Sequence, residues 1–230
     1  MKITTLASGS TGNCYIIEHE YSALIIECGV KLIDVKKALN FQLQNIVGCL
    51  ISHSHLDHCK YVKDFAKSGI NIYCSEKTKK EFSCAPFGIK TFQSGVKFKI
   101  SPWTVYPFKL HHSVENHGFI ICDKANETLL FATDTSYISE NFVGLNYILI
   151  EANYCDKIIQ ENIEFSKQSH AHFMHSFSGH MSIDTCCKWL SNQDLRQCKE
   201  IRLIHLSNGN SNEIEFKSRI EKEFGIPCVL

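Results

Sequence analysis

Short apolar runs rich in β-branched residues recur along the chain, and several are followed by Gly or Ser. Runs of this length and composition are typical of β-strands that are covered by other elements. Where they are followed by polar segments with helical spacing, the pattern indicates an α/β protein. The predicted strands are residues 2–6, 14–18, 23–28, 46–51, 70–74, 97–103, 126–131, 147–150 and 202–206.

Helices are predicted at 34–40, 59–67, 75–82, 183–191 and 211–224. Ser182 is a typical N-cap for the fourth, and Gly225 lies just past the end of the fifth. In that last helix Ile214, Ile220 and Phe224 are expected to face inward. Because no repeat, low-complexity tract or Pro-rich linker divides the chain, we expect one domain over residues 1–230.

The most informative stretch is ISHSHLDHC, which places His53, His55, Asp57 and His58 directly after the strand at 46–51. In an extended segment alternate residues point the same way, so His53 and His55 converge on one point. Asp57 and His58 come as the chain turns into a helix and are directed at a neighbouring point. A solvated histidine-rich loop is the alternative. Imidazole and carboxylate in this density favour a metal site, with Zn²⁺ the best match and Mn²⁺ or Fe²⁺ acceptable.

Later strands also end in polar residues. His112, Asp134 and Glu151 each follow an apolar run, and His205 lies within the run LIHLS. Functional side chains at successive strand ends are how open sheets build a site. The neighbouring His111 is an alternative to His112.

One further candidate, His180, lies outside these strand ends. The segment SGHMSIDTCC offers His180 just before a helix, and Glu151 offers a carboxylate to orient it.

The N-terminal turn ASGSTGN permits two interpretations, a phosphate-cradling loop or a tight strand connection. The connection is favoured because no Lys-Ser/Thr follows and no helix opens there.

Composition limits the classes of function. The 230 residues are 44% hydrophobic, which is ample for a sizeable core, and 24 basic residues balance 24 acidic ones. Long nucleic acid is disfavoured as a partner because sequence-independent phosphate binding needs a basic surface. The N-terminus lacks the layout of a signal peptide and no membrane span is expected, so a cytosolic location is predicted. The 12 cysteines are then expected to be reduced, and most of them buried.

The H-x-H-x-D-H motif resembles the signature of the metallo-β-lactamase superfamily. The resemblance implies an αββα sandwich, two mixed sheets flanked by helices, that binds two divalent metal ions, zinc or alternatively manganese. It assigns His53, His55 and His112 to one ion, Asp57, His58 and His205 to the other, and Asp134 as the bridge.

Within the superfamily, Glu151 after an apolar strand, the segment GHMS and the strand end His-Leu-Ser resemble the phosphodiesterase branch, which includes transfer-RNA 3′-processing enzymes. The resemblance makes His180 the general acid and Glu151 its partner. The predicted catalytic residues are therefore Asp57, His180 and Glu151, and phosphodiester hydrolysis is favoured over amide hydrolysis.

The opening ASGSTGNCYIIE, the GHMS segment and the ending LIHLSNGNSNEIEFKSRIEKEFGIPCVL resemble phage anti-Pycsar proteins. That resemblance implies a homodimeric enzyme that hydrolyses cyclic mononucleotide signals, located in the host cytoplasm if it is phage-encoded. A bacterial exonuclease family that shares ASGS and GHMS-like segments is the alternative, with DNA or RNA as substrate. A protein that sequesters a nucleotide without cleaving it is a third hypothesis.

The segment 163–178 contains His170, His172 and His175 together with three phenylalanines. One interpretation is a flap that supplies an aromatic face for a base and imidazoles for a phosphate. The other is a dimer contact or an ordinary surface loop.

Overall fold

The computed structural model describes residues 1–82, 88–166 and 179–230. The chain divides into two compact units. The first unit comprises Met1–Lys109 and Ile120–Glu127, and the second comprises Leu110–Phe119 and Thr128–Leu230. His170, His172 and His175 lie outside the described residues. The prediction of a single domain remains a prediction.

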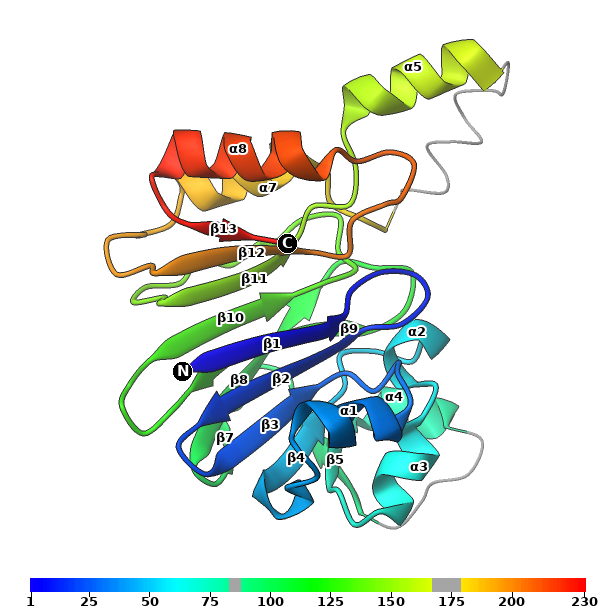
Figure 1. The fold of residues 1–230 in the computed structure, drawn as a ribbon, viewed down its shortest axis with the longest axis vertical. Helices are drawn as coiled ribbons and strands as arrows, with labels where there is room; N and C mark the ends of the chain where they lie inside the picture. The colour runs from blue at the N-terminus through cyan, green and yellow to red at the C-terminus, as the bar shows by residue number, and fades with distance from the viewer. Residues whose placement is uncertain (83–87, 167–178) are drawn as a thin grey trace. The chain divides into compact units, whose positions relative to one another are not determined.

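A six-stranded sheet lies in the first unit, with the strands in sequence order (Figure 1). The pairs β1–β2 and β2–β3 are antiparallel, whereas β3–β4, β4–β5 and β5–β6 are parallel, so the sheet is mixed. Parallel strands end at one edge, which is where the histidine motif begins. The strands are β1 (Lys2–Ala7), β2 (Cys14–His19), β3 (Ser22–Ile26), β4 (Ile46–Leu50), β5 (Ile72–Ser75) and β6 (Ile89–Phe92).

Helices pack beside this sheet and close a core in which Val35 and Phe65 are fully buried. They are α1 (Leu32–Ala38), a 3₁₀ turn η1 (Leu43–Asn45), α2 (Leu56–Cys59), α3 (Val62–Lys67) and α4 (Glu76–Glu81). The prediction of one helix over 59–67 was wrong at its start. The chain breaks between α2 and α3 because the amide of Tyr61 donates to the carbonyl oxygen of Cys28, at 3.1 Å, instead of continuing a helix.

A hairpin replaces the single strand predicted at 97–103. It consists of β7 (Phe98–Ile100) and β8 (Trp103–Leu110), which are antiparallel. Pro102 lies at the turn between them, and proline has no amide hydrogen to continue a strand ladder. The Phe98 ring stacks at 5.7 Å on the rings of both Tyr73 and Phe92, which packs the hairpin onto the first sheet.

The second sheet has the order β13-β12-β11-β10-β9-β8-β7, and the division between units falls within β8 and β9. Its strands in the second unit are parallel from β10 to β13. Two mixed sheets with helices therefore confirm the predicted α/β fold class. The remaining strands are β9 (Asn116–Cys122), β10 (Thr128–Ala132), β11 (Tyr147–Glu151), β12 (Glu200–Ile204) and β13 (Cys228–Val229).

The second unit carries the helices α5 (Asp156–Ser166), α7 (Ile183–Ser191) and α8 (Glu213–Phe224), of which α7 and α8 lie over β12 and β13 (Figure 1). Ser182 caps α7 by accepting a hydrogen bond from the amide of Thr185, and Gly225 ends α8 in the left-handed conformation, both as predicted. The inward position of Ile214 was wrong, since Ile214 is 83% exposed. Ile220 is buried as predicted, and Phe216, four residues before it, forms the buried stripe with it.

The described cysteines are unpaired thiols, and most are buried. Burial raises the pKa of Cys59 and of Cys74 to about 12, so these thiols stay protonated at neutral pH. Within the described part of the chain, no helix has both the length and the apolar character needed to cross a bilayer.

Candidate metal centre

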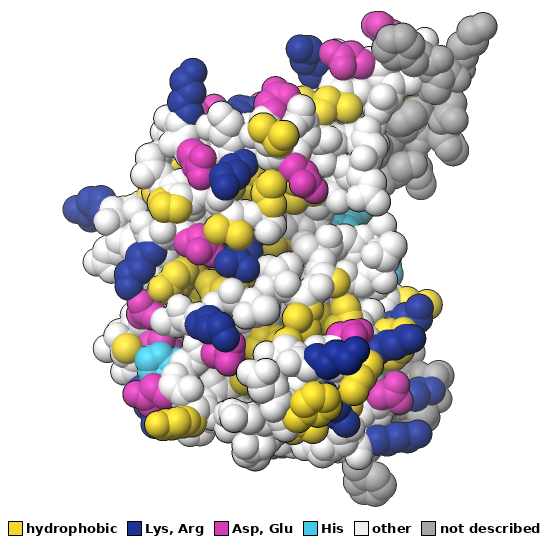
Figure 2. Space-filling view, viewed as in Figure 1, with side chains coloured by type: hydrophobic (Ala, Val, Ile, Leu, Met, Phe, Trp, Pro, Cys, Tyr) yellow, Lys and Arg dark blue, Asp and Glu magenta, His cyan; other side chains and the backbone are white. Residues whose placement is uncertain are grey.

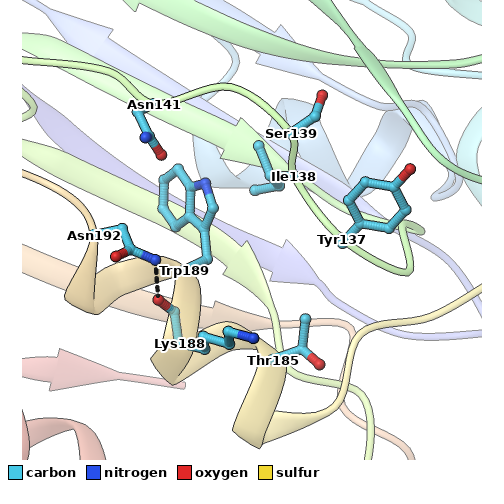
Figure 3. A pocket seen from close by; sticks show the side chains of 8 residues that line it. All are labelled: Tyr137, Ile138, Ser139, Asn141, Thr185, Lys188, Trp189 and Asn192. Carbon is cyan, nitrogen blue, oxygen red and sulfur yellow. Dashed lines mark hydrogen bonds between the residues drawn. The ribbon is translucent and has the colours of Figure 1, made fainter.

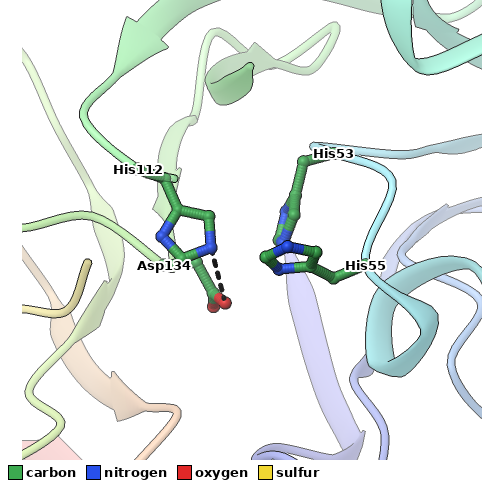
Figure 4. Close-up of side chains that lie close together, drawn as sticks. All are labelled: His53, His55, His112 and Asp134. Carbon is green, nitrogen blue, oxygen red and sulfur yellow. Dashed lines mark ion pairs between the residues drawn. The ribbon is translucent and has the colours of Figure 1, made fainter. Parts of the chain in front are cut away.

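The histidine motif of the first unit begins where β4 ends. Three imidazoles gather there: the His53 ring centroid lies 4.7 Å from that of His55 and 4.2 Å from that of His58. His53 and His58 are fully buried. His53 and His55 leave the backbone on the same side of this loop, as Figure 4 shows, and Asp57 and His58 follow in the short helix α2.

Neighbouring groups orient these rings. The Ser52 hydroxyl lies 2.9 Å from Nδ1 of His53, and a carboxylate oxygen of the buried Glu27 lies 3.6 Å from Nδ1 of His58. Glu27 follows β3 and accepts a hydrogen bond from the Ser52 amide at 3.2 Å. Burial raises the pKa of Glu27, and the nearby His58 and Ser52 lower it in part. At His53, the contact that engages Nδ1 directs Nε2 toward a ligand, a common arrangement around protein metals.

The ASGSTGN turn contacts the motif directly. The amide nitrogen of Asn13 lies 3.2 Å from Oδ2 of Asp57 and 3.1 Å from Nε2 of His58. The Asn13 backbone amide donates to the carbonyl oxygen of Asp57 at 2.7 Å. Only glycine fits at position 29, because a Cβ there would lie 1.7 Å from the same carbonyl oxygen. The turn is therefore a strand connection that also supports the histidine motif.

The second unit gathers its candidates at the ends of three parallel strands. Asp134 follows β10, Glu151 ends β11 and His205 follows β12. The parallel register brings these ends to one edge of the sheet, with Glu151 paired to Ile204. Ligand-capable atoms of Asp134, Glu151, His180 and His205 all lie within 4.8 Å of one another.

The carboxylate of Asp134 faces two histidines. Its Oδ2 lies 3.7 Å from Nε2 of His112, an ion pair drawn in Figure 4, and its Oδ1 lies 3.6 Å from Nε2 of His205. Asp134 therefore lies between two imidazoles, as expected if it is the predicted bridging ligand. The His111 ring instead stacks on Tyr137 with centroids 3.9 Å apart, so the structure places His112 and not His111 beside Asp134.

As in the first unit, neighbouring groups contact the Nδ1 atoms of these histidines. Nδ1 of His112 donates to the carbonyl oxygen of Gly179 at 3.0 Å, and Nδ1 of His205 lies 3.3 Å from Oε1 of Glu151. Both therefore present Nε2 to Asp134. A Cβ at Gly179 would lie 2.5 Å from Nδ1 of His112, so this position also requires glycine.

His180 and Glu151 form a close pair, with Nδ1 of His180 at 2.6 Å from Oε1 of Glu151. Burial lowers the pKa of His180, but the hydrogen bond and charge of Glu151 and the charge of Asp134 outweigh it, so the pKa is raised above its usual value. The His180 side chain is 20% exposed, compared with 5% for His112 and His205. An accessible imidazole whose charged form is stabilised by a neighbouring carboxylate is suited to act as a general acid.

Three of the residues at these strand ends have left-handed backbone geometry although none is glycine. The φ angles are 65° at Glu27, 51° at Asp134 and 55° at His205. Such conformations cost roughly 1–3 kcal/mol each and cluster at functional sites, where the surrounding structure holds them.

A family model described as "Metallo-beta-lactamase superfamily" matches residues 7–152, which is more than half of the chain. This chain belongs to the metallo-β-lactamase superfamily. Exodeoxyribonuclease WalJ of Streptococcus pneumoniae serotype 2 is 25% identical over 225 residues, which cover 91% of this chain and 83% of that protein. Exodeoxyribonuclease YycJ of Bacillus anthracis is 24% identical over 244 residues, which cover 98% and 92%.

Solved structures share the superfamily fold at low identity. YhfI of Bacillus subtilis, a metallo-β-lactamase fold protein, matches with a TM-score of 0.71 and 17% identity, covering 99% of this chain and 94% of that one. A diphosphatase of the PhnP family matches at 0.67 and 14%, with the same coverage. The short form of human tRNase Z matches at 0.61 and 16%, covering 100% and 96%. These likenesses establish the fold alone.

The donor groups fit the metals that the superfamily implies. Buried imidazoles with fixed Nδ1 contacts and a carboxylate between two Nε2 atoms are the ligands that Zn²⁺ prefers. The superfamily and its His/Asp cluster make the chain a metal-dependent hydrolase. The assignment of individual ligands to two ions stays a prediction.

Sequence reasoning missed the residues that support these ligands, namely Asn13, Glu27, Ser52, Gly29 and Gly179. A signal existed for Glu27, which stands at the end of a strand in IIECG as Glu151 does in ILIEA. The role of Gly179 depends on a contact with His112 across 67 residues, which no local pattern indicates.

Proposed function

We propose that this chain is a metal-dependent phosphodiesterase that removes nucleotides from the ends of DNA. The observation that carries the proposal is the His180–Glu151 pair at 2.6 Å, which adjoins Asp134 and His205 within the second unit. Two relatives named as exodeoxyribonucleases, alike over most of their length, support DNA as the substrate class. The sequence alone favours a cyclic mononucleotide, whereas these relatives favour the DNA alternative.

The residues divide the chemistry between them. His53, His55, Asp57, His58, His112, Asp134 and His205 are proposed to hold two divalent ions, zinc or manganese. When bound, such ions lower the pKa of a coordinated water and offset charge that builds on phosphoryl oxygens. His180 then donates its Nε2 proton to the departing sugar oxygen.

Glu151 makes that proton transfer possible. By accepting from Nδ1 it fixes the ring with Nε2 outward and stabilises the charged form of His180. Its other oxygen accepts from the amide of Thr135 at 2.8 Å, which holds the carboxylate itself in place. A sugar alkoxide is a poor leaving group, so a phosphodiesterase has a use for this acid.

Hydrolysis of cyclic mononucleotides is the second candidate, because the chain has no net charge. On the face drawn in Figure 2, Lys and Arg side chains are interspersed with Asp and Glu. Several are paired, as Lys2 is with Glu18 and Arg219 with Asp184. Binding of long polyanions is expected to be weak on such a surface, whereas binding of a small anion does not need an extended basic surface.

A substrate panel separates the candidates. Purified protein loaded with Zn²⁺ or Mn²⁺ is incubated with end-labelled single- and double-stranded DNA, RNA, cyclic dinucleotides and cyclic mononucleotides. Multiple-turnover release of mononucleotides from DNA ends is the expected result. Turnover confined to cyclic mononucleotides would establish the second candidate. Stoichiometric capture without turnover would identify a binding protein and overturn both. The homodimer remains a prediction.

A further inference from the structure

A pocket of about 330 Å³ lies in the second unit, apart from the ligands described above (Figure 3). One wall is the segment from Tyr137 to Asn141, which follows Asp134 by three residues. The other is α7, through Thr185, Lys188 and Trp189, with Asn192 just after it. Pockets of this size hold one small organic molecule.

The two walls are fixed to each other. The indole nitrogen of Trp189 on α7 donates to the carbonyl oxygen of Glu140 at 3.0 Å. The Gln193 side chain donates to Oδ1 of Asn141 at 2.8 Å and accepts from the amide of Phe142 at 3.0 Å. These bonds join segments about fifty residues apart in sequence, so the pocket is formed before any ligand arrives.

Its lining combines aromatic faces with hydrogen-bonding groups and one positive charge. The Tyr137 ring is covered on one face by His111, yet the residue is 47% exposed, which leaves the other face accessible. Trp189 supplies an apolar surface, Asn141 and Thr185 supply polar groups, and Lys188 is the charged lining residue, with no carboxylate among its lining side chains. A flat ring, a hydrogen-bonding edge and a negative charge are what a nucleotide offers.

Hydrogen bonds tie both walls to the proposed acid. The Thr135 hydroxyl donates to the carbonyl oxygen of Tyr137 at 2.8 Å, and the Thr135 amide donates to Glu151 at 2.8 Å. On the other side α7 begins three residues after His180, and the Met181 amide lies 3.4 Å from Glu151. A ligand in the pocket is therefore held by the same segments that position the acid and its carboxylate.

We propose that this pocket is a nucleotide subsite, in which Tyr137 stacks on the base of a nucleotide next to the cleaved phosphodiester and Lys188 pairs with its phosphate. The proposal rests on the proposed function, because it takes the substrate to contain nucleotides. It adds where the base is recognised and which residues do so.

Binding of deoxynucleoside 5′-monophosphates and of the matching deoxynucleosides to the metal-loaded full chain is measured by equilibrium dialysis. We expect Tyr137→Ala to weaken binding of both by about tenfold or more, the usual effect of losing a stacking aromatic residue. Tyr137→Phe, which keeps the ring, is expected to restore binding. Lys188→Ala is expected to weaken binding of the monophosphate and not that of the deoxynucleoside. The matched control is Tyr21→Ala, since Tyr21 is 88% exposed in the first unit.

Kinetics give a second readout. The ratio of kcat/KM for thymidine 5′-(p-nitrophenyl phosphate) to that for bis(p-nitrophenyl) phosphate, which has no base, is expected to fall about tenfold in Tyr137→Ala. Unchanged binding and an unchanged ratio in both Tyr137→Ala and Lys188→Ala would overturn the subsite and leave the proposed function intact. If wild type cleaves neither ester nor DNA, the proposed function fails, while dialysis still decides whether the pocket binds nucleotides.

Discussion

Replacing His180 by Ala tests the division of labour between metal ligands and proton donor. General acid loss usually costs about 10²–10⁴ in rate, or roughly 3–5 kcal/mol of activation free energy. The fold is expected to persist, because the buried Glu151 keeps its hydrogen bond from the Thr135 amide at 2.8 Å. Metal content is expected to stay near wild type, since His180 lies outside the predicted ligand set.

The assay compares two leaving groups under single-turnover conditions. A p-nitrophenyl ester departs as a stabilised anion and needs no proton, so His180→Ala is expected to cleave thymidine 5′-(p-nitrophenyl phosphate) almost as fast as wild type. Cleavage of an oligodeoxynucleotide, which expels a sugar alkoxide, is expected to slow by the full factor. His19→Ala is the control for loss of an imidazole, because His19 pairs with Asp123 in the first unit.

Two results would refute this reasoning. If both substrates slowed equally, His180 would be binding phosphate or metal instead of donating a proton. If neither slowed, the acid would have to be sought elsewhere, with His170, His172 and His175 as the next candidates.

Four further variants probe the centre. Asp134→Ala and Asp57→Ala are each expected to lose bound metal and with it activity, and normal rates with two ions per chain would contradict the ligand assignment. Glu151→Gln removes the charge that raises the pKa of His180, so the basic limb of the pH–rate profile is expected to move to lower pH. A basic limb that does not move would show that Glu151 does not set the pKa of the catalytic acid. Gly179→Ala is expected to lower metal affinity about tenfold or more by displacing the histidine it contacts, whereas Gly209→Ala, with open space around it, is not.

The gathering of polar side chains at the strand ends could be predicted because it depends on local pattern. An apolar run that ends in a polar residue marks a strand end, and parallel strands bring their ends to one edge. Asp134, Glu151 and His205 follow this rule, and the structure places their ligand-capable atoms within 4.8 Å of one another. The same reasoning located the N-cap Ser182 and the helix end at Gly225.

The supporting contacts could not be predicted because each joins distant parts of the chain. Glu27 reaches His58 across 31 positions, and Asn13 reaches His58 across 45. The helix break at Tyr61 has the same origin, since its cause is a hydrogen bond to Cys28. Local sequence carries no information about these partners, so glycine at positions 29 and 179 looks like ordinary turn chemistry until the contacts are known.

One carboxylate contacts both the proposed acid and a predicted metal ligand. Oε1 of Glu151 faces Nδ1 of both His180 and His205, at 2.6 and 3.3 Å, while Oε2 accepts from backbone amides. In Glu151→Gln the side-chain oxygen is expected to go on accepting hydrogen bonds from those backbone amides, so the NH₂ group faces the two imidazoles. An NH₂ group donates to Nδ1 and therefore favours the imidazole tautomer that carries its proton on Nε2. A His205 protonated at Nε2 cannot bind a cation through that atom.

Glu151→Gln is therefore expected to weaken metal binding roughly 10–100-fold in addition to shifting the pH profile. His180→Ala, which leaves the carboxylate in place, is not expected to weaken it. Titration of the two metal-stripped variants with Zn²⁺ distinguishes them, and equal affinities would show that Glu151 serves the acid alone.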